Sequence, residues 1–400
     1  MEKNKRGFIS MTLVYTFLII FLFLMLAILS TYNTKNKYLE AIDSKVDDDI
    51  RDNRNSRDGI LNKLITDNTP DVADTLKFHK LANLNVGNGN GLYYSTDAEI
   101  FDEDADNSIA NKVYFFRGEV ENNYLILGSS CFRILRSDEY GNIRMIYGGE
   151  ASGGRCVRFS NGQKVATMAY NDANASNGYQ ASPKSELYLK YIYTFGATRT
   201  ITSPSSTIRT YLENWFNNKF SDNAYLVDSI YCNNMSTGGP AVGGVSYYNA
   251  YGFNTEIANL DDQNEFVDNL KFKKDFAIGC ESKEDRYSIS SFIKPANPRG
   301  NQLLTASVGL ITAEEAILAG GEIDLDNTSY FLHRGNSYWT MSPYSYDNVN
   351  GAQVAYIDGN GAIKYAPVNT QLDVVPVVTI NKNSSVAGGT GKYDDPYRLK

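Results

Sequence analysis

Apolar and polar positions divide the chain into a uniform N-terminal segment and a long, alternating remainder. Residues 8–32, FISMTLVYTFLIIFLFLMLAILSTY, hold 25 positions without a charge. As a helix rising about 1.5 Å per residue, this segment would span about 37 Å, enough to cross a hydrocarbon core of about 30 Å. Lys3, Lys5 and Arg6 precede it, so the positive-inside rule places the basic leader, residues 1–7, in the cytoplasm. We expect a transmembrane helix over residues 8–32, in contact with membrane lipid, and an extracellular C-terminal domain of a single-pass cell-membrane protein.

A cleaved secretory signal is the alternative interpretation of this segment. Such signals have an apolar region of about 7–15 residues followed by a cleavage site of small residues. The apolar run here is longer, and no A-x-A sequence follows it. The pattern therefore favours a retained helix.

Helical periodicity continues after residue 32. Apolar residues recur at spacings of three and four in two short runs separated by Gly59, which is typical of an amphipathic helix. The two runs are Tyr38, Leu39, Ile42, Val46 and Ile50, and then Ile60, Leu61, Leu64 and Ile65. The Thr69–Pro70 pair ends the pattern. We expect a helical stalk over residues 33–66 and a linker over residues 67–92, which is rich in Asn, Asp and Gly.

From residue 93 onward the pattern changes to short apolar runs bounded by Gly, Asn and Asp, which is typical of strands. The predicted strands are 112–117, 123–127, 131–135, 142–147, 338–341, 353–357, 362–365 and 374–380, with a tight hairpin turn at 359–361. Two helices interrupt them. One covers 207–220 with Ser206 as its cap, and the other covers 313–319 with a Thr312–Glu315 capping box. We expect residues 93–400 to form an α+β domain rich in short antiparallel strands.

The four cysteines, Cys131, Cys156, Cys232 and Cys280, all follow the apolar segment. An even number of cysteines outside the cytoplasm is most simply explained by two disulfides. We expect sequential pairing, Cys131 with Cys156 and Cys232 with Cys280, although spacing alone does not decide it. A zinc site is the alternative, but no two cysteines have C-x₂₋₄-C spacing. We expect no metal.

Composition restricts the chemistry. The net charge is −8 with no basic run, which argues against nucleic acid as a partner. Two histidines among 400 residues make a histidine-dependent triad improbable by composition, and no phosphate- or dinucleotide-binding fingerprint is present. We expect neither an enzyme nor a cofactor. Carboxylates are plentiful, so a carbohydrate-active enzyme that uses a carboxylate pair stays open as an alternative.

The residues Lys5-Arg6-Gly7-Phe8 resemble the type IV prepilin (class III) signal. The resemblance implies cleavage between Gly7 and Phe8, methylation of Phe8, and pilin-like subunits as partners. Pilins usually carry glutamate at the fifth mature position, and this chain has Thr12 there, so filament assembly stays open. A plain signal anchor is the alternative.

Six motifs between residues 112 and 400 follow an order that resembles an uncharacterised family of extracellular Firmicutes proteins. The motifs are YFFRG (114–118), CFRI (131–134), IRMIY (143–147), GLITAEEA (309–316), YWTMSP (338–343) and VPVV (375–378). The terminal pattern is also similar to C-type-lectin-like folds. That resemblance implies a ligand surface beside the last strands, with Tyr344, Tyr346, Asp347, Asn348 and Tyr356 as candidate contacts. We expect Trp339 itself to lie in the core.

Together these patterns predict a membrane-anchored, pilin-like surface protein that displays a lectin-like recognition or adhesion domain for a glycan or protein ligand. Two alternatives remain: a structural envelope protein without a ligand, and the carbohydrate-active enzyme.

The prepilin resemblance makes one direct prediction. If the peptidase cuts after Gly7, the intact mass and N-terminal sequence of the mature protein begin at a methylated Phe8. A mature protein that retains Met1 contradicts this prediction and leaves the signal anchor.

Overall fold

The structure is a computed structural model. It describes Tyr15 and Met25, both helical, and residues 58–72, 89–95, 113–138, 140–159, 163–171, 206–221, 223–233, 246–247, 283–290, 299–347 and 351–400. The chain divides into two compact units, residues 1–56 and 57–400. The fold below is that of the second unit.

The larger sheet has nine strands. Its main path runs β1 (Asp71–Val72), β2 (Gly91–Ser95), β3 (Val113–Arg117), β5 (Ser130–Ser137), β4 (Tyr124–Leu127), β17 (Tyr397–Leu399) and β16 (Val386–Gly388). A branch leaves β5 through β6 (Ile143–Glu150) and reaches β15 (Val377–Ile380). β5 is therefore the centre of this sheet, since its two halves pair with β4 and β3 and its other edge pairs with β6.

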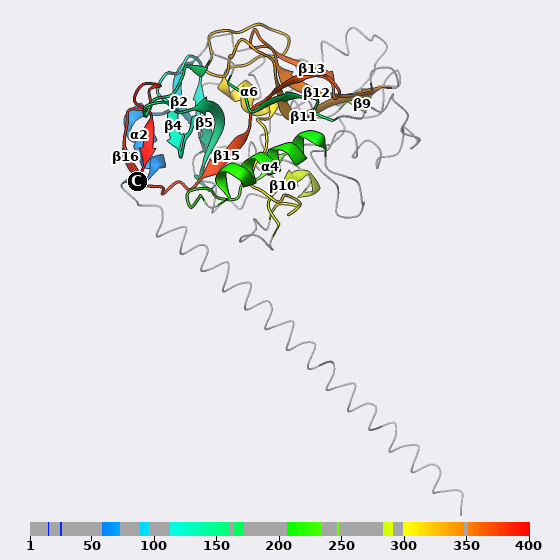
Figure 1. The fold of residues 1–400 in the computed structure, drawn as a ribbon, viewed down its shortest axis with the longest axis horizontal. Coiled ribbons are helices and arrows are strands. Elements are labelled where there is room, and N and C mark those ends of the chain that lie inside the picture. Colours follow the sequence, from blue (N-terminus) through cyan, green and yellow to red (C-terminus); the bar gives the residue numbers. More distant parts are fainter. Residues whose placement is uncertain are drawn as a thin grey trace, which may run out of the picture. The chain divides into compact units, whose positions relative to one another are not determined.

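The smaller sheet has six strands and lies on the other side of the unit in Figure 1. Its order is β13 (Ile363–Pro367), β12 (Gly351–Ile357), β11 (Tyr338–Asp347), β14 (Leu372–Val374) and β7 (Ala166–Met168), with β9 (Ser246–Tyr247) also on β11. A two-stranded sheet joins β8 (Tyr231–Cys232) to β10 (Arg286–Tyr287), which follows the short 3₁₀ turn η7 (Lys283–Asp285). The strand segments predicted from the sequence are confirmed, except that Pro376 divides the last one into β14 and β15.

Three α-helices accompany the sheets: α2 (Ile60–Asn68), α4 (Thr207–Phe220) and α6 (Ala313–Ala319). The two predicted caps are confirmed. The Ser206 hydroxyl accepts from the backbone N–H of Arg209, and Thr312 and Glu315 form a reciprocal capping box. Gly320 ends α6 in the left-handed region, at φ 116°, which glycine adopts without steric cost.

Helix α6 connects the two sheets. It contacts β3 of the larger sheet and β11 and β12 of the smaller one, and Figure 1 shows it between them. Trp339, fully buried at 0% exposure, lies in this core as predicted. Its indole N–H donates to the Met168 carbonyl, and its ring meets Tyr170 edge-on.

A buried ion cluster joins α6 to the larger sheet. The Glu315 carboxylate accepts Arg136 Nε at 2.8 Å and lies 2.7 Å from Arg144 Nε, and both arginines come from neighbouring strands. Burial opposes the ionised carboxylate, but Arg144 and Arg136 together hold the pKa of Glu315 below its ordinary value. Glu315 is thus both a helix cap and the counter-ion of two buried cations.

The predicted fold class, with its long N-terminal transmembrane helix, is wrong for what the structure shows. The described helices other than the isolated positions 15 and 25 have 9, 14 and 7 residues, and the fold is rich in strands. Among the described residues, no helix is long and apolar enough to span a bilayer. The physical reason for the error is that hydropathy measures only a segment's preference for an apolar environment, whereas strand pairing between distant segments decides this fold.

The predicted stalk and linker also need correction where the structure describes them. Ile60 and Leu64 of α2 are buried, and the Ile60 N–H donates to the Ser384 carbonyl. Asp67 accepts from the Tyr397 hydroxyl. The second amphipathic run therefore docks against the C-terminal segment of the same unit. The apolar stripe that suggested a stalk buries itself in this core, and the linker contributes β1 and part of β2.

Replacing Glu315 tests the ion cluster. Glu315→Gln leaves Arg136 and Arg144 buried without a carboxylate, so we expect a loss of about 3–5 kcal/mol in the free energy of unfolding by urea titration. The exposed Glu121→Gln is the matched control and should change that free energy by less than about 0.5 kcal/mol. Because the folded-state pKa of Glu315 is depressed, its contribution is present above the unfolded-state pKa and is lost as pH falls toward the folded-state value. If the unfolding free energies of wild type and Glu315→Gln fall equally as the pH is lowered, the assignment is contradicted.

Candidate ligand-binding pocket

Two of the predicted ligand contacts, Tyr344 and Tyr356, lie on neighbouring strands of the smaller sheet. Tyr344, Tyr346 and Asp347 belong to β11, and Tyr356 belongs to β12. Asn348 lies outside the described residues, as do Gly7 and Phe8 of the predicted processing site. Tyr356 pairs with Trp339 on one side and with Lys364 on the other. Its ring meets Trp339 edge-on.

Tyr344 has a partner that the sequence analysis missed, Tyr365 on β13. Their rings stack with centroids 3.9 Å apart and an interplanar angle of 13°. Tyr365 pairs with Ala355, the neighbour of Tyr356 in β12, and successive residues of a strand point to opposite faces. The Tyr344–Tyr365 pair and Tyr356 therefore occupy opposite faces of the sheet. Each ring of the pair also covers one face of the other, so the pair offers less open aromatic surface than two separate tyrosines.

A pocket of about 130 Å³ lies elsewhere, at the end of the larger sheet. Its walls come from β4, β5 and the segments that follow β3, β6, α6 and β16, which are distant in sequence. The lining residues are Glu119, Val120, Glu121, Tyr124, Arg133, Arg158, Phe159, Thr328, Tyr330, Phe331, His333 and Tyr393. Aromatic rings and charged groups of both signs thus face one small space.

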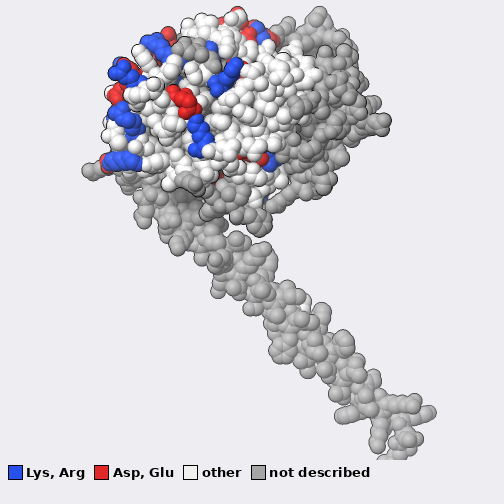
Figure 2. Space-filling view, in the orientation of Figure 1, with Lys and Arg blue, Asp and Glu red and all other residues white. Residues whose placement is uncertain are grey.

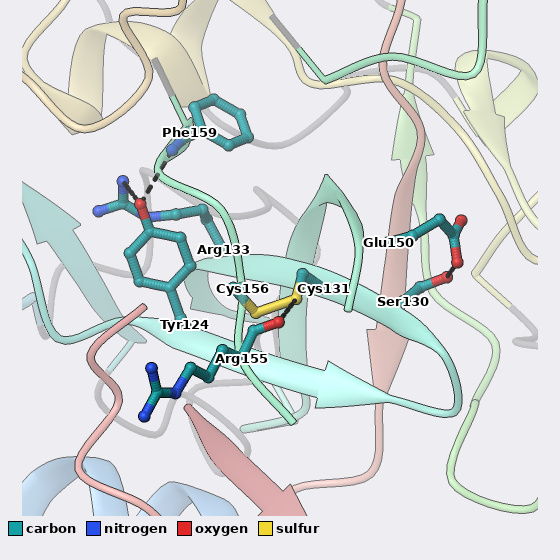
Figure 3. The surroundings of a disulfide bond; sticks show 8 residues. All are labelled: Tyr124, Ser130, Cys131, Arg133, Glu150, Arg155, Cys156 and Phe159. Atoms are coloured by element: carbon teal, nitrogen blue, oxygen red, sulfur yellow. Dashed lines mark hydrogen bonds between the residues drawn. A yellow bond between two sulfur atoms is a disulfide. The ribbon is translucent and has the colours of Figure 1, made fainter. Parts of the chain in front are cut away.

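Arg133 forms the floor of the pocket. It is 4% exposed and projects from β5 toward Tyr124 and Phe159 (Figure 3). Its Nε donates to Asn123 Oδ1 at 2.6 Å, and its Nη1 donates to the Tyr124 hydroxyl at 3.1 Å. The guanidinium carbon lies 4.2 Å from the centroid of the Tyr124 ring. Burial lowers the pKa of Arg133 to about 10, so the group remains a cation at neutral pH.

Further bonds fix the same wall. Arg133 also donates to the carbonyls of Val120 and Phe331, and the Tyr124 hydroxyl accepts the backbone N–H of Phe159 at 3.1 Å. Arg133, together with Tyr124, therefore holds three chain segments around the pocket, residues 120–124, 159 and 331. It uses only neutral acceptors to do so.

The Cys131–Cys156 disulfide holds the segment that carries Arg158 and Phe159. Cys131 is on β5, two residues before Arg133, and the two Cα atoms of the bridge are 5.7 Å apart. The predicted pairing is confirmed, and Figure 3 shows the bridge beside the Arg133 cluster. Cys232 is also disulfide-bonded. Cys280, its predicted partner, lies outside the described residues.

The rim of the pocket is polar and exposed. The Arg158 side chain is 61% exposed and lies 3.9 Å from the Glu121 carboxylate and 4.9 Å from the centre of the Tyr393 ring. His333 is half-buried. Among its described contacts, the ring forms no hydrogen bond with a side chain, and its Nε2 lies 3.0 Å from the Gly359 carbonyl.

The surface around the described residues is electrostatically mixed. On the face shown in Figure 2, lysines and arginines are separated by uncharged surface and by acidic side chains. Within the described ranges, no group of three or more His, Cys, Asp and Glu side chains is arranged to hold a metal ion. The pocket is thus distinguished from the rest of the described surface mainly by its concave shape.

The pocket's two carboxylates, Glu119 and Glu121, are exposed at its rim. Burial does raise the pKa of Glu314 to about 8. However, Glu314 is not a pocket residue, and its carboxylate accepts from the Ser342 hydroxyl inside the core.

Comparison of the chain with protein-family models, with curated proteins and with solved structures gave no match. The functional argument rests on the pocket itself.

Removing the bridge tests its structural role. The cysteines are 25 residues apart, so the chain-entropy estimate gives about 3.5 kcal/mol of stabilisation. We expect the double variant Cys131→Ser/Cys156→Ser to lose about that amount in urea unfolding. Val157→Ser, an exposed change beside Cys156, is the control and should be nearly neutral. Equal unfolding midpoints for the double variant and wild type would show that the bridge does not stabilise the fold.

Proposed function

We propose that residues 57–400 form an exported recognition domain that binds a saccharide unit in the Arg133–Tyr393 pocket. The observation that carries this proposal is the lining itself: aromatic rings beside charged groups of both signs, in a concavity fixed by a disulfide and a buried arginine. Ligand sites typically combine an apolar lining with a few well-placed polar groups.

The size and charge of the pocket favour this ligand class. A cavity of about 150 Å³ holds one benzene ring, so a pocket of about 130 Å³ takes in part of one six-membered ring, with the remainder of the ligand outside its open mouth. Arg133 and Arg158 are balanced by Glu119 and Glu121, which suits a neutral ligand. A pyranose offers hydroxyls to these charged groups and C–H faces to the Tyr393 ring.

The disulfides support a location outside the cytoplasm. Structural disulfides persist in oxidising compartments and are rare in the cytosol. The pocket-bearing segment depends on Cys131–Cys156, so an exterior location and an intact pocket go together. Display at the cell surface, for adhesion or for an accessory role among pilin-like subunits, follows as part of the proposal.

Binding of glycans to the full-length, oxidised protein tests the proposal. A glycan array identifies the saccharide, and calorimetry on the best hit measures its affinity. We expect Tyr393→Ala and Arg158→Ala each to weaken binding about tenfold, the equivalent of about 1.4 kcal/mol. Both side chains lie at the rim, so the fold should persist.

Tyr365→Ala is the matched control, because it removes an exposed tyrosine, 45% accessible, that is not a pocket residue. We expect unchanged binding. If Tyr365→Ala weakens binding and Tyr393→Ala does not, the ligand belongs to the β11–β13 surface and the pocket assignment is wrong. A silent array favours the structural envelope protein, and release of products from a polysaccharide panel favours the enzyme.

A further inference from the structure

Among the residues that the structure describes, Arg334 is a buried cation whose Nη1 and Nη2 have no hydrogen-bond partner. Its residue is 2% exposed, and neither Nη1 nor Nη2 has an acceptor. The guanidinium carbon lies 4.4 Å from the centroid of the Phe159 ring and 5.2 Å from that of Tyr338. Aromatic faces attract a cation, but they leave the in-plane N–H groups of the guanidinium unsatisfied.

Other buried arginines of the described chain are compensated in recognisable ways. Arg136 and Arg144 share Glu315, and Arg209 pairs with Glu213. Arg117 donates to two carbonyls near the end of α6, and Arg133 donates to carbonyls and to Tyr124. The contrast matters because a buried polar group without a partner destabilises the fold, and more so when the group is charged.

The carboxylate that interacts with Arg334 does not fill this role. Asp373 interacts with Arg334 through space, but its carboxylate is already bonded. Oδ1 accepts from Lys164 Nζ and from the Thr167 hydroxyl, each at 2.8 Å, and Oδ2 accepts from Asn336. Burial lowers the pKa of Arg334 to about 10, so deprotonation does not remove the charge at neutral pH.

Arg334 also lies directly behind the pocket wall. Its neighbour His333 and its ring partner Phe159 both line the pocket. A second buried arginine also lies near the Phe159 ring, since Arg133 Cζ is 5.8 Å from its centroid. Two buried cations therefore lie close to one ring of the pocket wall.

We propose that the Nη1 and Nη2 groups of Arg334 form a binding site for a small monovalent anion, a halide or a carboxylate, reached from the pocket past Phe159. The guanidinium edge presents two parallel N–H donors, a geometry that suits a carboxylate or a single halide. This inference is independent of the saccharide proposal, because the anion site requires no sugar.

Bromide is the probe. The thermal midpoint of the full-length, oxidised protein is measured while bromide replaces a bulky organic sulfonate at constant ionic strength. An anion that binds only the folded state stabilises it by mass action, so we expect a saturable rise of about 2–4 °C in wild type. Arg334→Gln should abolish the rise, and Arg398→Gln, which removes an exposed arginine outside the pocket, should retain it. A rise that persists in Arg334→Gln, or none in wild type, overturns the proposal.

Crystals of the wild-type protein grown in bromide keep the test decisive if Arg334→Gln does not fold. We expect an anomalous peak within hydrogen-bond distance of the Arg334 guanidinium. An ordered water there without anomalous signal, or bromide only at other positions, contradicts the site. Acetate, titrated in the same way, distinguishes a carboxylate site from one that accepts halides alone, and failure with both probes overturns the proposal.

Discussion

The covalent bridge between β5 and the segment after β6 is the constraint on which the pocket depends. Cys131 lies two positions before Arg133, and Cys156 lies two and three positions before Arg158 and Phe159. The bridge therefore joins the pocket floor to its aromatic wall and its cationic rim. Arg133 then completes the arrangement by holding the turn after β3 and the segment after α6 through backbone carbonyls. The first constraint is covalent and the second electrostatic, and they act on the same loops.

Buried arginines organise the rest of this unit. One pair meets Glu315, so that α6 is fixed to the larger sheet by charge as well as by apolar contact. Arg117 extends the same helix's attachment through carbonyls at its C-terminal end. Arg334 differs because its described close contacts are two aromatic rings, those of Phe159 and Tyr338. The paired arginines therefore stabilise the fold, whereas Arg334 is the arginine for which we propose a binding role.

The parts of the fold that sequence predicts are those with a local physical cause. Ser206 and the Thr312–Glu315 box mark helix starts because their side chains satisfy N–H groups within three residues. The Cys131–Cys156 pairing was expected but not decided by spacing, and the structure shows that the β5–β6 hairpin lies between the two cysteines. The same local rules predicted α2 as a helix but not its burial, because an amphipathic stripe does not specify what covers it. They also produced the long transmembrane helix, which the described structure does not contain.

The candidate site was less accessible to such reasoning. Arg133 stands inside a motif that the sequence analysis quoted, yet nothing local distinguishes a buried arginine from a surface one. Tyr365, which lies outside the pocket, could have been placed from sequence. The predicted turn at 359–361 pairs its strand with that of Tyr356, and alternation along the strand puts the two tyrosines on opposite faces. Tyr393 and His333 could not, because only the β4–β17 pairing and the turn before β11 bring them to the pocket. Non-local pairing, which no window of sequence contains, creates this site.

A crystal structure of the oxidised protein with a bound saccharide tests the central claim most directly. The account predicts sugar density inside the pocket, with a ring against Tyr393 and hydroxyls within hydrogen-bond distance of Arg158 or Glu121. Density on the Tyr344–Tyr365 pair with an empty pocket would contradict it.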